Sequence, residues 1–407
     1  MSRSGHAARV SAAISAAHRD EWAAVLASTA RFAGDLDLAE ECAQEAFARA
    51  VEVWPERGIP ERPGAWLTAV AANRARDILR RQTALRRRLP LLVRDETGQD
   101  DGWRSDDRLR LIFTCCHPAI ARDAQVALTL RLVCGVPTGD IAAAFLVSEP
   151  TMAARITRAK RKIQAARIPF RVPDVRELPA RVEAVCDVLY LVFTVGHAPP
   201  SGDAVVHDEM VDAAIGLTRM LRDLLPRDRQ VAGLLALMLL IDARRDTRDE
   251  LLPDQDRSRW DRARIQEGLA LLETAAAGPV DRYAISAAIA AAHARARSWA
   301  DTDWAQIVDL YGALGTAWPS PVVELNRAVA IGMRDGAQAG LAAVDAIAGD
   351  PALVRYAYLP AARAAFLADL GRWGEAADAY AEAAALAGSE PERVRLEAQT
   401  TKARSRI

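Results

Sequence analysis

The feature that most constrains this chain is an apolar stripe with the 3.6-residue period of a helix, which recurs along nearly the whole sequence. The stripe is clear in residues 14–54 and resumes after breaks that contain proline or glycine at residues 55–64, 86–106 and 168–179. Alanine and arginine are abundant and aromatic residues make up only 5%, which favours helix over sheet. The pattern therefore predicts an all-α protein. In residues 14–54 the stripe comprises Val25, Leu26, Phe32, Leu36, Ala39, Ala43, Phe47, Val51 and Trp54.

A chain of 407 residues is too long for one ordinary hydrophobic core, so the breaks are expected to separate domains. We predict helical domains at residues 14–85, 107–168 and 180–407, with a linker at 86–106 and a connector at 169–179.

Several classes of protein are excluded by what the sequence lacks. The longest apolar run, residues 234–241, is too short to cross a bilayer, so we expect a soluble, cytoplasmic protein with no membrane partner. The five cysteines follow no metal-ligand spacing, and we expect neither a disulfide framework nor a bound metal or cofactor. His197, His207 and His293 lack the partner spacing for metal or triad chemistry, so no catalytic residue is predicted.

The net charge of −1 conceals an asymmetry between the two halves of the chain. Residues 1–168 hold 26 Lys and Arg against 20 Asp and Glu, whereas residues 169–407 hold 27 against 34. The basic side chains concentrate in residues 65–94 and 149–171, each of which contains a single acid. A basic front half indicates binding to a polyanion, with a regulatory or protein-binding part attached.

Residues 138–164, TGDIAAAFLVSEPTMAARITRAKRKIQ, have the layout of a helix-turn-helix. A short helix is followed by a turn at Leu146 and Val147. Ser148 is a suitable N-cap for the longer basic helix, which has Pro150 in its first turn. In this motif the second helix enters the major groove, where early positions face bases and later ones face the phosphate backbone. The alternative is an ordinary helical hairpin.

Acidic residues recur at three- and four-residue intervals in residues 37–50, which places them on one face of a helix. Apolar residues such as Ala43 and Phe47 occupy the opposite face and pack inward. The acidic face is either a docking surface for a basic groove on a partner protein or an ordinary solvated face.

Residues 63–81 form a predicted helix that Trp66 and Val70 anchor and that carries arginine on its polar side. Asn73 adds an amide that can hydrogen-bond a base edge. Arginine suits this role because its planar guanidinium binds phosphates bidentately and stacks on bases. The alternative is a helix that is merely soluble and rich in arginine.

With these three motifs in this order, the first 168 residues resemble an extracytoplasmic-function (ECF) sigma factor of the sigma-70 family. DLAEECAQEAF is similar to the region 2.2 helix that binds the clamp of core RNA polymerase. AWLTAVAANRARDILRR is similar to regions 2.3 and 2.4, which melt and read the −10 element, and residues 107–168 resemble region 4, which reads the −35 element. The resemblance implies a dissociable sigma factor and not an enzyme. Its partners would be core RNA polymerase and promoter DNA, the latter as −35 duplex and as melted −10 strand.

The resemblance also implies roles for individual residues. The polymerase-binding residues would be Asp37, Glu40, Glu41, Gln44 and Glu45. The residues at the melted −10 strand would be Trp66, Asn73, Arg74, Arg76, Arg80 and Arg81. The residues at the −35 duplex would be Thr151, Ala153, Arg155, Thr157, Arg158, Lys160, Arg161 and Lys162. Many relatives have glycine in place of Leu146 and a polar or basic residue in place of Ala153, so the turn and the base readout are expected to differ here.

Residues 180–407 resemble the C-terminal helical, tetratricopeptide-like extension of one group of these sigma factors. The clearest repeat signature is LGRWGEAADAYAEAAALA, in which Ala376, Tyr380 and Ala383 have the spacing for close packing of two helices. Stacked helical pairs leave a concave groove, which suits a protein or peptide ligand.

Two other functions compete with this interpretation. The first is a helix-turn-helix transcriptional regulator with a helical sensor domain, which leaves residues 37–81 unexplained. The second is an enzyme that uses the polar segment Asp254 to Asp261, although it lacks a nucleophile–base pair, a phosphate loop and a metal set. We interpret that segment as a structural ion-pair loop around a buried Trp260.

The opposed charges of the two halves lead to a hypothesis about control. Residues 180–407 would regulate the sigma factor in cis, either by masking Arg74–Arg94 or Lys160–Lys162 or by helping to hold the polymerase.

Overall fold

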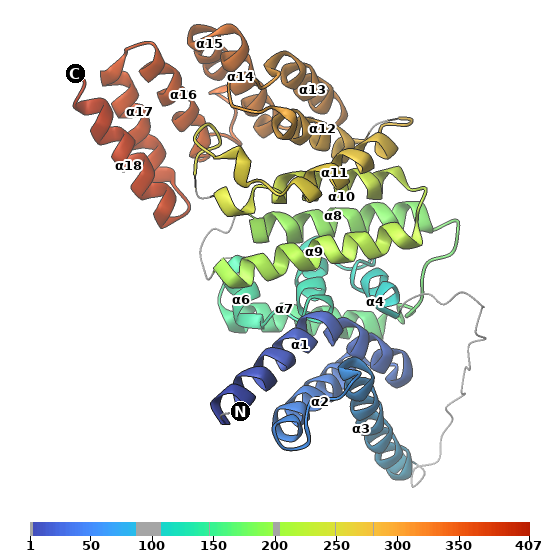
Figure 1. The fold of residues 1–407 in the computed structure, drawn as a ribbon. Coiled ribbons are helices and arrows are strands. Elements are labelled where there is room, and N and C mark those ends of the chain that lie inside the picture. The colour runs from blue at the N-terminus through green and yellow to red at the C-terminus, as the bar shows by residue number, and fades with distance from the viewer. Residues whose placement is uncertain (1–2, 87–106, 146, 198–203, 249, 280) are drawn as a thin grey trace. The chain divides into compact units, whose positions relative to one another are not determined.

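The computed structural model describes residues 3–86, 107–145, 147–197, 204–248, 250–279 and 281–407. Every element in these ranges is helical (Figure 1), and none of the helices has both the length and the apolar character needed to cross a bilayer. The chain divides into two compact units, Met1–Leu224 and Leu225–Ile407. The boundary expected at residues 169–179 therefore lies inside the first unit. Apart from Arg86, the predicted linker lies outside the described residues.

The first unit begins with a bundle of three helices, α1 (Arg3–Ala33), α2 (Leu36–Arg57) and α3 (Pro63–Arg86), each of which packs on the other two. Most of the predicted stripe is confirmed, because Leu26, Ala43 and Trp54 are fully buried. Asp35 begins α2 as its N-cap, since its carboxylate accepts hydrogen bonds from the amides of Asp37 (2.8 Å) and Leu38 (3.0 Å).

Two expectations for this bundle are corrected. The loop predicted from Pro55 starts later, because α2 continues through Pro55 to Arg57; in the last turn the missing proline amide removes only one hydrogen bond. Phe32 and Val51 do not belong to the core, since they are 49% and 56% exposed. Phe32 lies instead under the guanidinium of Arg76, whose Cζ is 5.5 Å from the ring centroid.

Five short helical segments follow in the first unit. They are α4 (Asp107–Cys115), α5 (Arg122–Leu128), the π-helix η1 (Thr129–Val133), α6 (Thr138–Ala144) and α7 (Glu149–Ala165). The predicted helix-turn-helix is confirmed as α6 and α7, which pack on each other while α7 also packs on α5. Ser148 precedes α7 as expected, but its hydroxyl hydrogen-bonds the Thr151 hydroxyl (2.8 Å) and not a backbone amide. Leu146 lies outside the described residues.

The π-helix follows α5 without a break, so the two form one helical segment whose last turn is widened. The Cys134 amide donates to the Thr129 carbonyl at 3.0 Å, five residues back, which is the widened π pattern. Pro137, five residues beyond Leu132, has no N–H to offer the Leu132 carbonyl. That carbonyl accepts a hydrogen bond from Trp22 Nε1 of α1 at 3.2 Å, so the π turn connects this segment to the first bundle.

The first unit ends with α8 (Leu178–His197) and α9 (Ala204–Leu224), which lie side by side (Figure 1). Helix α8 packs on α4 and α5. Arg122 of α5 donates to the Ala184 carbonyl at 3.1 Å and pairs with Asp187. Val185 and Leu189 are fully buried. Helix α8 thus packs on the helix-turn-helix part (α4–α7), which belongs to the same unit.

The second unit is a succession of helices in which most elements pack on the next one along the chain. They are α10 (Arg229–Asp242), α11 (Arg262–Ala275), α12 (Arg282–Arg295), α13 (Trp304–Ala317), α14 (Pro321–Asp335), α15 (Ala337–Ile347), α16 (Tyr358–Asp369), α17 (Trp373–Leu386) and α18 (Glu390–Arg404), with two short 3₁₀ turns, η2 (Arg245–Thr247) and η3 (Arg257–Arg259). Ala376 and Ala383 are fully buried and Tyr380 is half-buried, which is the close packing expected from their spacing.

The polar segment before α11 is structural, as predicted. Trp260 is 4% exposed, and its Nε1 donates to the Thr247 hydroxyl at 3.1 Å. The buried Arg257 guanidinium donates to the carbonyls of His293 (2.7 Å) and Ala296 (2.9 Å), so it caps the C-terminal end of α12.

Candidate nucleic-acid interface

The recognition helix α7 presents most of its predicted DNA-binding residues on the surface. The exposed ones are Thr151, Ala153, Thr157, Arg158, Arg161 and Lys162. Arg155 is half-buried, with its guanidinium 3.8 Å from the Asp123 carboxylate and 5.6 Å from the Phe145 ring centroid. The three exposed cations, Arg158, Arg161 and Lys162, lie within about 100° of one another around the helix.

Lys160 does not share this surface. At roughly 100° per residue it lies about 200° around the helix from Arg158. It also follows the buried Ile156 by four residues, which places it at the edge of the apolar stripe that packs inward. Its side chain is 9% exposed. The helical period of the sequence is enough to place Lys160 on the inward side. Its position next to Arg161 and Lys162 in the sequence wrongly suggests that the three share one surface.

Helix α3 is anchored by Leu67, Ala71 and Ala75, which are fully buried, rather than by the half-buried Trp66 and Val70. Its predicted −10 residues are mostly on the surface. The exposed ones are Asn73, Arg76, Arg80 and Arg81.

Three of the −10 residues are engaged within the bundle. Asn73 Oδ1 accepts a hydrogen bond from Arg76 Nη1 at 2.5 Å. Arg74 pairs with Glu45 of α2 at 2.6 Å, so one predicted DNA-binding residue neutralises one predicted polymerase-binding residue.

A cavity of about 390 Å³ opens where α2 ends and α3 begins. Trp54 and Trp66 line it with their ring centroids 5.7 Å apart, and Arg49 and Arg57 add positive charge. The buried Nε1 of Trp54 has no hydrogen-bond partner among the described residues. The sequence pattern placed Trp54 in the core but did not indicate this cavity. Gly58, with φ of +86°, makes the turn that brings the two tryptophans together.

The acidic residues of α2 do not share one environment. Asp37 and Glu40 face the helix-turn-helix part, Glu45 faces α3, and Glu41 is exposed. Gln44 is exposed, and its amide donates to Glu40 Oε1 at 3.2 Å.

The Glu40 carboxylate lies at the contact between the first bundle and the helix-turn-helix part. Arg131 Nε of the π-helix donates to Glu40 Oε1 at 2.6 Å, and Lys160 Nζ donates to Glu40 Oε2. Lys160 also donates to Asp37 Oδ1 at 2.8 Å. Burial by itself lowers the pKa of Lys160, but attraction and hydrogen bonding to Glu40 and Asp37 outweigh it and leave that pKa raised. Sequence reasoning missed Arg131 entirely.

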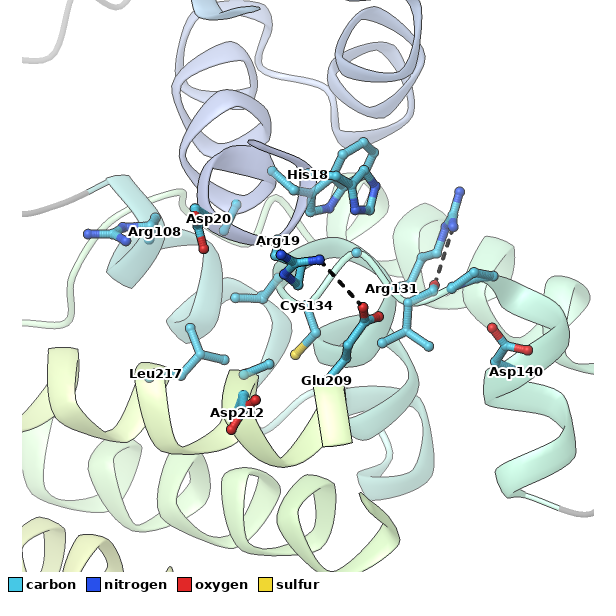
Figure 2. Close-up of a pocket in the computed structure, with 18 of the residues that line it drawn as sticks. His18, Arg19, Asp20, Arg108, Arg131, Cys134, Asp140, Glu209, Asp212 and Leu217 are labelled. Atoms are coloured by element: carbon cyan, nitrogen blue, oxygen red, sulfur yellow. Dashed lines mark hydrogen bonds and ion pairs between the residues drawn. The ribbon is translucent and has the colours of Figure 1, made fainter. Parts of the chain in front are cut away.

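A second cavity, of about 740 Å³, adjoins this contact (Figure 2). It is lined by residues of α1, the π-helix segment and α9, among them His18, Arg131 and Glu209. Arg19 and Glu209 approach to 4.0 Å across it.

No group of three or more His, Cys, Asp and Glu side chains in the described ranges is arranged to hold a metal ion. Cys116 is fully buried, and burial raises the pKa of its thiol to about 12.

Three family models match parts of this chain. Residues 22–85 match the family "Sigma-70 region 2" and residues 110–163 match "Sigma-70, region 4". Residues 181–276 match a family of unknown function, DUF6596. An uncharacterized protein of Rhizobium meliloti (strain 1021) is 43% identical over 381 residues, which is 89% of each chain. No solved structure matches.

Proposed function

The chain belongs to the sigma-70 family of non-enzymatic transcription initiation factors, and we propose that it is an ECF-type sigma factor that binds core RNA polymerase. Residues 22–85 supply region 2 and residues 110–163 supply region 4. This function belongs in the cytoplasm, where the polymerase acts.

The observation that carries the proposal is that one compact unit presents two separate surfaces with exposed basic side chains, one on α7 and one on α3. On α7, Arg158, Arg161 and Lys162 form a solvated basic face on a recognition helix, which suits duplex DNA. A conventional repressor needs this face alone. The second surface, on α3, is explained by a sigma factor because an initiating polymerase must also hold unpaired bases.

The cavity beside Trp54 and Trp66 supports a role at the melted −10 strand. An extruded base must be held on its polar edge and against an aromatic or apolar wall. The Trp54 N–H is a buried donor without a partner among the described residues, and Arg49 and Arg57, which line the cavity, supply positive charge for the adjoining phosphates.

Run-off transcription tests the proposal. Purified core polymerase is incubated with and without the full-length protein on DNA from upstream of its own gene. We expect a defined start site only when the protein is present. The proposal is refuted if no transcript appears and the protein also fails to bind core polymerase in a pull-down.

We propose in addition that the C-terminal part regulates the sigma factor in cis, as the opposed charges suggest. The contact of α8 with region 4, through Arg122, Asp187 and the Ala184 carbonyl, supports this. Asp187→Arg in the full chain is expected to change the transcription rate at a fixed polymerase concentration. Glu183→Arg, which reverses the charge of an exposed carboxylate on the same helix, is the control. Equal rates for parent and Asp187→Arg would oppose regulation through α8. A protein or peptide ligand of residues 180–407 stays a prediction.

A further inference from the structure

Two of the residues expected to receive the polymerase, Asp37 and Glu40, are already paired within this chain. Lys160 of region 4 pairs with both Asp37 and Glu40 of region 2, and Arg131 pairs with Glu40 at 2.6 Å. Gln164 of α7 donates to Asp35 Oδ2 at 2.6 Å, one turn from the same ion pairs. Region 2 and region 4 are therefore joined through the acidic start of α2.

Glu40 is an unusual member of an acidic docking surface, because its side chain is only 10% exposed. A buried carboxylate is stable when cations and hydrogen bonds satisfy it, and one that loses its partners is costly. Lys160 and Arg131 supply two charges and Gln44 supplies an amide. Glu40 thus needs a cation in this position, and a basic group of another protein meets the same need.

The contact also has the features of a joint that can separate. The cavity of about 740 Å³ lies beside it, so part of the junction is not filled by side chains (Figure 2). Apolar contact between the regions includes Trp22, which is 3% exposed and hydrogen-bonds the Leu132 carbonyl of the π-helix. Where packing is incomplete, paired charges decide more of the preference for the closed arrangement.

We infer that Lys160 and Arg131 form a latch that holds region 4 on the acidic start of α2 and competes with a basic surface of core polymerase for Asp37 and Glu40. The inference rests on the proposed function. Lys160 is free to serve the latch because it lies on the side of α7 opposite Arg158, away from the predicted DNA face. Polymerase binding through Asp37 and Glu40 and closure of the latch then exclude each other.

Carbodiimide crosslinking tests whether the latch exists and opens. This zero-length reagent joins an ammonium to a carboxylate only when the two are in contact, and Asp37 is 55% exposed and therefore within reach of it. Full-length protein is treated alone and with saturating core polymerase, and the products are mapped by mass spectrometry. We expect a Lys160–Asp37 link in the free protein that is lost in the complex. Absence of the link in the free protein, or its persistence in the bound protein, overturns the inference.

A charge reversal tests the competition. Lys160→Glu places a third carboxylate beside Asp37 and Glu40 and should raise the affinity for core polymerase, measured without DNA, by about tenfold as the closed population falls. Arg176→Glu makes the same charge change at an exposed position away from the latch and should leave that affinity within about twofold. Equal affinities for the two variants overturn the latch.

A second variant keeps the test decisive if Lys160→Glu does not fold. Lys160→Met removes the charge and keeps the aliphatic length, and it should raise the affinity in the same direction by a smaller factor. If no form of the protein binds the polymerase but the free parent gives the crosslink, the proposed function fails while the contact between the regions stands.

Discussion

The salt dependence of promoter binding is the most direct measure of which side chains of α7 meet DNA. Each phosphate contact that is removed lowers the slope of log affinity against log salt by about 0.9. Arg158, Arg161 and Lys162 are exposed on one side of α7, whereas Lys160 is buried against region 2. The variant with all three exposed cations changed to alanine should therefore lose about 2.7 from the slope.

The same arithmetic predicts the loss of affinity at one salt concentration. At 0.15 M monovalent salt each contact contributes about 5.5-fold, so the triple variant should bind about 170-fold more weakly. The assay is fluorescence anisotropy of the preformed polymerase complex on a labelled promoter fragment, titrated at five salt concentrations. Helicity by circular dichroism confirms that each variant is folded.

Lys160→Met is the matched control, because it removes one positive charge from the same helix. We expect its slope to stay within about 0.3 of the parent, since Lys160 faces away from the DNA surface. The reasoning is refuted if Lys160→Met lowers the slope as much as Arg158→Ala, or if the triple variant keeps the parental slope.

Three further predictions follow from single contacts. Trp54→Phe keeps an aromatic wall but removes the N–H, and we expect promoter opening, followed by permanganate reactivity, to slow by about tenfold with −35 binding unchanged. Burial, with lesser contributions from two arginines, lowers the pKa of His293 to about 4, so the imidazole stays neutral in the folded chain. Because the unfolded chain takes up this proton near pH 6.5, the free energy of unfolding should fall as the pH drops below that value. We expect a loss of about 2 kcal/mol at pH 5, measured by urea unfolding. Gly332→Ala should cost about 1–3 kcal/mol in the same assay, because an added Cβ would lie 2.2 Å from Phe366 Cζ and 3.0 Å from Gly340 Cα.

Each of these has its own control. If the Trp54→Phe protein opens promoters at the parental rate, the indole N–H does not contact the melted −10 strand. The His293→Gln variant should lose less stability than the parent between pH 7 and pH 5, and equal losses would contradict the assignment to His293. Gly349→Ala adds the same methyl group where no atom lies within 4 Å, so it should change the unfolding free energy by less than about 0.5 kcal/mol.

The local sequence pattern predicted the helices and the helix-turn-helix because the apolar period repeats every few residues and needs no distant partner. The same period predicts that Lys160 faces inward, because it follows the buried Ile156 by four residues. Grouping Lys160 with its charged neighbours in the sequence gives the wrong side of the helix. Acidic residues spaced along α2 were predicted to share one face. The structure divides them, since helices neighbour α2 on more than one side and each takes the nearest carboxylate.

The sequence by itself determined that the chain is helical, which helix carries the basic face and which family the chain resembles, because these depend on residues a few positions apart. Only the tertiary structure decided that Lys160 and Glu40, 120 residues apart, form a buried ion pair. It also decided that the Leu132 carbonyl, at the π turn before Pro137, accepts a hydrogen bond from Trp22 Nε1. Such pairs depend on how separate helices pack against each other. The period of apolar residues within one helix does not indicate which other helix will lie against it.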